Sequence, residues 1–96
     1  MLPGGILEAD GSAMIYTVVW EPAALDELAL LWMNAPDRRA VSAASNAIDA
    51  TLRRDPYGSS KTIPGGRALA VPPLVVAFSV SDPDCLVTVW SAWRQT

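Results

Sequence analysis

The chain has 96 residues, of which 51% are hydrophobic and 18% are charged, a balance that supports one folded domain with its own core. The formal net charge of −3 argues against a general nucleic-acid-binding protein. Histidine is absent, which excludes Ser–His and Cys–His nucleophiles and the commonest metal ligand, and the single cysteine, Cys85, excludes an internal disulfide. We therefore expect a cytoplasmic protein that needs neither a metal ion nor a cofactor.

The first thirteen residues, MLPGGILEADGSA, are rich in glycine, proline and small side chains. They have no basic region and no long apolar run, so they do not resemble a secretory signal. We expect residues 1–13 to be a flexible extension, with either Met1 or Met14 as the true start, and residues 14–96 to form a single domain. No apolar run in the chain is long enough to span a membrane.

A strand and a helix are predicted first. The β-branched and aromatic residues of Met14–Trp20 indicate a strand, and Pro22 suits the first turn of a helix that continues over Ala23–Asn34. Its leucines and Trp32 recur at helical spacing, which predicts a buried stripe. Trp20 is also expected in the core.

A second helix is predicted over Arg38–Arg54, with Asp37 as its N-cap. Apolar residues recur along it at spacings of three and four, and two arginines lie in its last turn, where cations favour the helix dipole. The sequence DPYG ends the helix. Because only a short link joins the two helices, we expect them to form an αα-hairpin.

A flexible polar loop, residues 58–66, is expected next, followed by strands over Arg67–Val71, Leu74–Val80 and Cys85–Trp93. Pro72-Pro73 and the turn SDPD separate these strands and favour antiparallel hairpins. Trp90 and Trp93 are three residues apart, so regular alternation would place one of them in the core and expose the other. The order is β-α-α-β-β-β, and we predict an α+β fold.

Several motifs in this order resemble the RelE/ParE superfamily, the small toxins of bacterial type II toxin–antitoxin pairs, over about residues 14–95. The motifs are VVWEPAALDELALL, LRRDPYG, PGGRALAV, the acidic turn SDPD, and a last strand with the spacing V-x-V-x-x-x-x-R that ends at Arg94. The resemblance implies a mostly antiparallel, strongly twisted sheet packed by the αα-hairpin. It also implies a cognate antitoxin whose extended or helical tail wraps the toxin and covers its site. A homodimer and a toxin–antitoxin hetero-oligomer are both open as the oligomeric state.

Two activities are known in this superfamily. RelE-like members are metal-independent endoribonucleases that cut mRNA on the ribosome, and ParE-like members poison DNA gyrase. Cleavage needs cations that stabilise charge on the phosphate, and the resemblance assigns this role to Lys61, Arg67 and Arg94. The arginine that usually opens the third strand and the tyrosine after the terminal arginine are both missing here.

These departures favour a protein that binds a macromolecular target, such as gyrase, or a catalytically degenerate member over an active nuclease. The residues expected to contact the target or the antitoxin are Tyr57, Arg67, Trp93 and Arg94. Alternative interpretations are that Arg67 pairs with Asp82 or Asp84 and that Arg94 is a solvated charge at a strand end. The whole chain could also be a small non-toxic α/β interaction domain whose partner pairs with an exposed strand edge.

Overall fold

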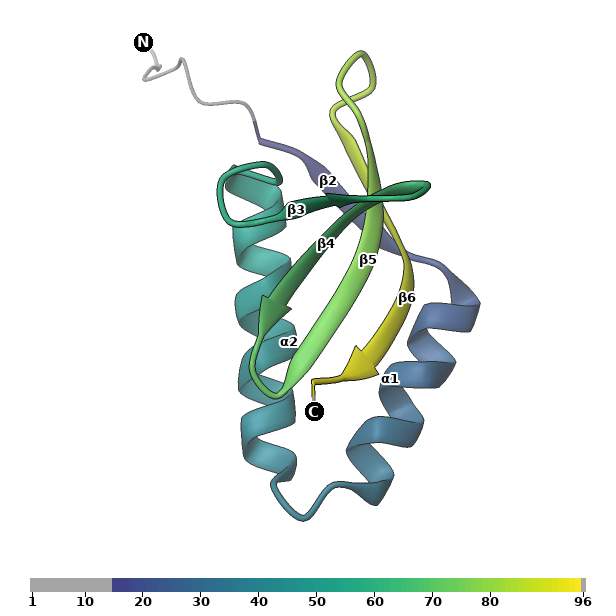
Figure 1. Ribbon diagram of the computed structural model, residues 1–96, viewed down its shortest axis with the longest axis vertical. Coiled ribbons are helices and arrows are strands. Elements are labelled where there is room, and N and C mark those ends of the chain that lie inside the picture. Colours follow the sequence, from purple (N-terminus) through teal and green to yellow (C-terminus); the bar gives the residue numbers. More distant parts are fainter. Residues whose placement is uncertain (1–14, 96) are drawn as a thin grey trace, which may run out of the picture.

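The computed structural model describes residues 15–95, and the predicted extension over residues 1–13 and the choice between Met1 and Met14 lie outside them. The described chain runs from one strand through two helices into four strands, as Figure 1 shows. The elements are β2 (Thr17–Trp20), α1 (Pro22–Asn34), α2 (Arg38–Arg54), β3 (Lys61–Ile63), β4 (Gly66–Val71), β5 (Leu74–Ser81) and β6 (Leu86–Arg94). The predicted helices and the predicted α+β class are confirmed.

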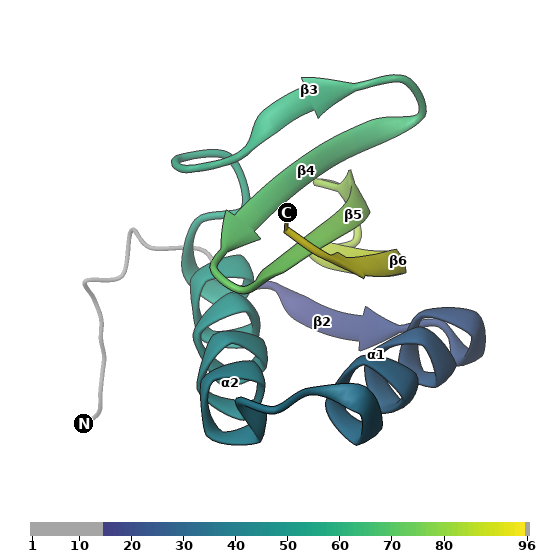
Figure 2. The ribbon, with the colours of Figure 1, turned by 60° about the horizontal axis from the view of Figure 1, so that its bottom comes forward.

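The strands form one five-stranded sheet in the order β2-β6-β5-β4-β3. β2 pairs parallel with β6, and the other three pairings are antiparallel. Both helices lie on the same side of the twisted sheet, and its other side carries no helix (Figure 2). The expected twisted, mostly antiparallel sheet packed by an αα-hairpin is therefore confirmed.

The expected loop over residues 58–66 is wrong in part, because it contains the edge strand β3. Lys61, Thr62 and Ile63 pair with Ala68, Arg67 and Gly66, so only Pro64 and Gly65 form the hairpin loop. Gly65 has a φ of +86°, which suits the second central position of a turn that proline begins. The next link, between β4 and β5, contains a cis peptide bond between Pro72 and Pro73.

The core lies between α2 and the middle of the sheet. α2 buries the apolar face predicted from its spacing, which consists of Val41, Ala44, Ile48 and Leu52. The sheet contributes buried residues of β4, β5 and β6, among them Leu69, Leu74, Val76, Phe78, Val87 and Val89. By contrast α1 packs mainly on β6, only lightly on α2, and buries only Ala24 completely.

The tryptophans depart from their predicted places. Trp32 is 41% exposed, because α1 presents only a narrow stripe to the one strand that it covers. Trp20 is half-buried against the core, whereas neither Trp90 nor Trp93 belongs to the buried core. The expectation that one of these two is a core residue is wrong. A β-bulge at Trp90, where Ala77 pairs with Ser91 and Phe78 with Val89, breaks the alternation on which that expectation relied.

Candidate functional site

The three cations predicted for catalysis do not converge. Lys61 lies opposite Ala68 on β4, so its side chain has the opposite orientation to that of the neighbouring residue Arg67. Arg94 lies in register with Leu74 and, through it, with Val71, four residues along β4 from Arg67. Four residues of strand span about 13 Å, so the two arginines lie at different ends of the sheet.

Arg94 forms a two-pronged ion pair with Asp37. Its Nη1 and Nη2 donate to Asp37 Oδ1 at 3.1 Å and Oδ2 at 2.9 Å. The hydrogen bond from Arg94 lowers the pKa of Asp37, and the hydrogen bond to Asp37 raises the pKa of Arg94. Asp37 is the N-cap residue of α2, as predicted, but its carboxylate makes no capping hydrogen bond, and both its oxygens accept from Arg94 instead. The pair ties the end of β6 to the link between the helices.

Arg67 is not paired with Asp82 or Asp84 in the described residues, contrary to one interpretation of the sequence. Its guanidinium donates to Ser60 Oγ at 2.7 Å, to Thr62 Oγ1 at 3.2 Å and to the Ser60 carbonyl at 3.3 Å. It also lies over the ring of Tyr57, with Cζ 5.1 Å from the ring centroid. Arg67 and Tyr57, two of the predicted binding residues, are therefore brought together.

A second tyrosine joins this group through Asp82. The hydroxyl of Tyr57 donates to the Asp82 carboxylate at 2.9 Å, and that of the buried Tyr16 donates to Oδ1 at 2.8 Å. These hydrogen bonds to Asp82 raise the pKa of Tyr57 and raise that of Tyr16 to about 12. We call Tyr16, Tyr57, Arg67 and Asp82 the tyrosine cluster. It joins the entry to β2, the start of the α2–β3 link, β4 and the turn after β5.

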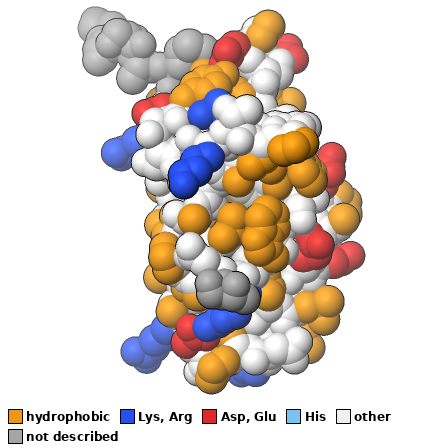
Figure 3. Space-filling model, in the orientation of Figure 1, with side chains coloured by type: hydrophobic (Ala, Val, Ile, Leu, Met, Phe, Trp, Pro, Cys, Tyr) orange, Lys and Arg blue, Asp and Glu red, His pale blue; other side chains and the backbone are white. Residues whose placement is uncertain are grey.

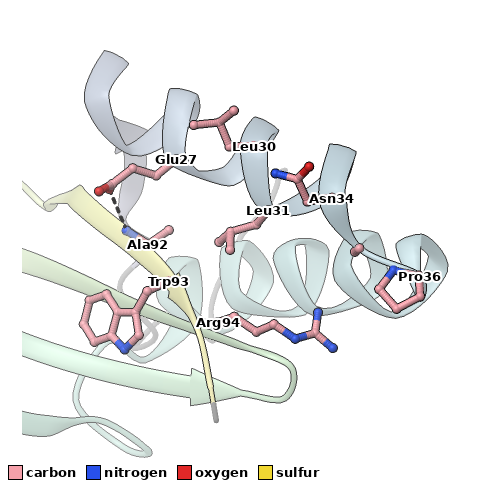
Figure 4. A pocket seen from close by; sticks show the side chains of 9 residues that line it. Glu27, Leu30, Leu31, Asn34, Pro36, Ala92, Trp93 and Arg94 are labelled. Carbon is pink, nitrogen blue, oxygen red and sulfur yellow. Dashed lines mark hydrogen bonds between the residues drawn. The ribbon is translucent and has the colours of Figure 1, made fainter.

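The C-terminal end of β6, opposite the end that follows the Asp82 turn, borders a cleft of about 480 Å³. One wall is the second half of α1 and the link that follows it, and the other is the last part of β6 (Figure 4). We call this the α1–β6 cleft, and it is lined by Glu27, Leu30, Leu31, Asn34, Ala35, Pro36, Ala92, Trp93 and Arg94. The cleft is mainly apolar, with charged groups at its two ends.

Glu27 joins the two walls of this cleft. Its Oε1 accepts hydrogen bonds from the Ser91 hydroxyl and from the Ala92 backbone N–H, both at 3.1 Å. Figure 4 shows Arg94 directed toward Pro36 and the Trp93 ring on the side of β6 away from α1. The side chains of Trp93 and Arg94, adjacent in the sequence, thus point to opposite sides of β6, although both residues line the cleft. The sequence analysis did not predict that Glu27 and Asp37 bind residues of β6, because nothing in the sequence indicates that either residue lies near that strand.

Apolar side chains are also exposed on the outer flank of α1. Leu30 and Met33 are 58% and 60% exposed, and Leu25 and Trp32 are exposed as well. Arg38 lies over the Trp32 ring and donates to the carbonyls of Trp32 and Met33, so it satisfies the end of the helix. A helix that is apolar around most of its circumference is normally covered by other elements. Arg38 and Ser42 of α2 contact Trp32 on this flank, but within residues 15–95 Leu25, Leu30, Trp32 and Met33 all remain exposed.

The helix-free side of the sheet carries a further apolar region. Figure 3 shows this side, with hydrophobic side chains gathered in the middle over the strands. Trp93, 42% exposed, lies across from Val75, and Ala70 follows in the same row of β4. This surface and the α1–β6 cleft lie on opposite sides of the last strand.

The described residues hold neither a metal site nor a membrane span. Within residues 15–95, no three carboxylate or thiol side chains are grouped so that they could hold a metal ion. In the same part of the chain, neither helix has the length and apolar character needed to cross a membrane.

Comparison with known proteins gives a match by structure alone. No protein-family model matches the sequence, and no curated protein matches it either. The structure is similar to a chain of the toxin–antitoxin complex RelBE2 from Mycobacterium tuberculosis, with a TM-score of 0.71 and 17% sequence identity. The match covers 85% of this chain and 93% of that chain. The protein therefore has the RelE-type fold that its sequence motifs predict.

Proposed function

We propose that this protein is the toxin component of a bacterial type II toxin–antitoxin pair, that a cognate antitoxin neutralises it in the cytoplasm, and that it acts by binding a macromolecular target. The similarity to a chain of a toxin–antitoxin complex supports the first part. The positions of the cations support binding over cleavage, because Lys61, Arg67 and Arg94 do not form one site.

The arrangement of each arginine also fits a binding role. Arg94 is neutralised by Asp37, and Arg67 directs its donors to uncharged oxygens. A phosphate that changes geometry during cleavage needs several converging donors in one place. Trp93 on the helix-free side and the exposed apolar residues of α1 offer the aromatic and apolar contacts that are enriched in protein interfaces.

Cleavage of mRNA on the ribosome is the second candidate, and the tyrosine cluster is the observation that favours it. Arg67 could hold a phosphate, and Tyr57 with Asp82 could exchange a proton with it. In this candidate Lys61 and Arg94 would have no direct part in the reaction.

Induced expression in a bacterial host tests the proposal. We expect growth arrest with intact mRNA, and rescue when the small protein of the adjacent reading frame is expressed with the toxin. An SOS response would indicate gyrase as the target, whereas cut mRNA would favour the nuclease. Normal growth in cells that contain the soluble, folded protein would contradict both candidates.

Two substitutions with a matched control sharpen this test. Trp93→Ala and Arg67→Ala should weaken growth arrest at equal protein levels, since both remove proposed contacts with the target. Arg54→Ala removes an exposed arginine at the end of α2 that makes no side-chain hydrogen bond in the described chain, so arrest should persist. Equal arrest by all three variants would place the target-binding surface elsewhere.

A further inference from the structure

The last part of β6 has an open edge. β2 pairs with β6 only as far as Val89, and the chain then leaves the sheet into α1. On its other edge β6 pairs with β5 as far as Arg94. Within residues 15–95, no strand lies on the β2 side of β6 beyond Val89.

The direction of the backbone groups along this edge follows from three hydrogen bonds. The N–H of Gln95 donates to the Pro73 carbonyl, so Gln95 faces the β5 side. Because N–H groups alternate along a strand, those of Ala92 and Arg94 face the opposite side, toward the α1–β6 cleft. The hydrogen bond from Ala92 N–H to Glu27 confirms this direction. On the far side of the bulge, the Val89 carbonyl accepts from Glu21 N–H.

The cleft thus has unpaired backbone groups of β6 on one side and apolar side chains of α1 and the following link on the other. Glu27 takes the place of a strand at Ala92, but it supplies only an acceptor for one N–H. The backbone C=O of Ala92 and both backbone groups of Arg94 face a space walled by Leu30, Leu31 and Pro36. A helix pairs its main-chain N–H and C=O groups within itself, so it has none to offer to this strand edge. An extended segment has these groups free.

We propose that an extended segment of the partner adds as a short strand to β6 at Ala92–Arg94, with an apolar side chain inserted between Leu30 and Leu31 of α1 and the strand. This inference rests on the proposed toxin function, in which the partner is the antitoxin. The added segment accepts from Arg94 N–H and donates to the Ala92 carbonyl, so the partner's backbone supplies the affinity and its alternate side chains supply the specificity. Glu27 stays in place and marks where the added strand ends.

The test uses the purified product of the adjacent reading frame as the partner. Amide hydrogen exchange, followed by NMR, should show that exchange at Arg94 slows at least tenfold in the complex, because the N–H gains a backbone acceptor. An unchanged rate at Arg94 in a stable complex would overturn this inference and leave the toxin proposal standing. Failure to form any complex would overturn both.

Two variants at position 94 separate the contribution of the backbone N–H of Arg94 from that of its side chain. Arg94→Ala and Arg94→Pro both remove the ion pair with Asp37, but only the proline removes the N–H, and proline is tolerated where that group faces no strand. We expect the proline variant to bind the partner about tenfold more weakly than the alanine variant. Equal affinities of two folded variants would contradict the proposal, and if the proline variant does not fold, the exchange rate of Arg94 in the unmodified protein decides.

A second copy of this chain is the competing occupant of the edge. If exchange at Arg94 slows with increasing concentration of the protein alone, and sedimentation shows a dimer, the edge is a self-association surface and the proposed partner strand is excluded.

Discussion

At the scale of single residues, the most densely connected group is the tyrosine cluster. The carboxylate of Asp82 accepts hydrogen bonds from the hydroxyl groups of Tyr16 and Tyr57. The three residues come from distant parts of the sequence. A carboxylate that accepts two hydroxyl hydrogen bonds stabilises the protonated form of each phenol, which is why both tyrosine pKa values are raised. The cluster therefore makes the stability of the folded state depend on pH in the alkaline range.

The direction of this coupling gives a prediction. A raised pKa means that the folded state holds the phenol proton more tightly than the unfolded state, whose ordinary value is 10.0. The contribution to stability is complete below pH 10 and is lost as the pH rises through about 12, the value for Tyr16. Since Tyr16 and Tyr57 are the only tyrosines, ultraviolet absorbance of tyrosinate reports them directly.

Asp82→Asn should move both tyrosine titrations down toward the ordinary value, because it removes the hydrogen bond to a carboxylate and the negative charge of that carboxylate. Asp84→Asn is the matched control, since Asp84 lies in the same turn but accepts only from the Ser81 hydroxyl. Native tyrosines that titrate together near their ordinary value would show that the cluster does not form in solution.

At the scale of elements, the two helices differ in how they are held. α2 buries four apolar side chains along its whole length. α1 completely buries only Ala24, and its Leu28 and Leu31 are only partly buried against the core. Much of the rest of its attachment is polar, through the Glu27 hydrogen bonds to β6 and the Arg38 contacts at its end. Polar contacts at the surface contribute less than buried apolar area. α1 is therefore the more weakly attached helix.

Native-state hydrogen exchange should show this difference. We expect the amides of the middle of α1 to exchange through a local opening of lower free energy than the amides around Ile48 in α2, which should exchange only on global unfolding. Equal opening free energies for the two helices would mean that α1 is held as firmly as α2. Binding of a partner to α1 should remove the difference.

The sequence predicted both helices well, because each has strong spacing and clear end signals, but not the degree to which α1 is covered. Leu25 and Trp32 fit a buried stripe on a helical wheel, yet a helix that lies along one strand at the side of a sheet buries less than a full face. β3 has three mainly polar residues, too few for a periodic pattern. Its only signal was Pro64-Gly65, a pair that suits a tight hairpin turn.

The candidate site was predicted only in part. Arg67 and Tyr57 were both named as candidates from the sequence, but their contact depends on how the link after α2 folds back on β4. The partner of Arg94 lies 57 positions earlier, and only the packing of α1 on β6 brings it near. The bulge at Trp90, which decides which residues of β6 face the core and which groups face the cleft, has no mark in the sequence.

At the scale of the whole molecule, stability depends on the contact between α2 and the sheet. Ile48 is fully buried at the centre of α2 and belongs to the core formed with β4, β5 and β6. Ile48→Ala should lower the free energy of unfolding by about 3 kcal/mol, since it leaves a cavity that the rigid sheet cannot fill. Chemical denaturation measures this change.

Ile15→Ala is the matched control, because Ile15 is exposed and the same atoms are removed. Its effect should stay within about 0.5 kcal/mol. Similar losses at both positions would mean that the core is not centred on α2.

The parallel pairing of β2 with β6 has a consequence for synthesis. The first described strand hydrogen-bonds only to the last, so it has no place in the sheet while the ribosome is still adding the residues between them. Contacts that join distant parts of a chain form late and slowly. β2 and the helix that it leads into must therefore wait, unpaired, until β6 has emerged. Whatever this fold does in the cell, it can begin only after translation has passed Arg94.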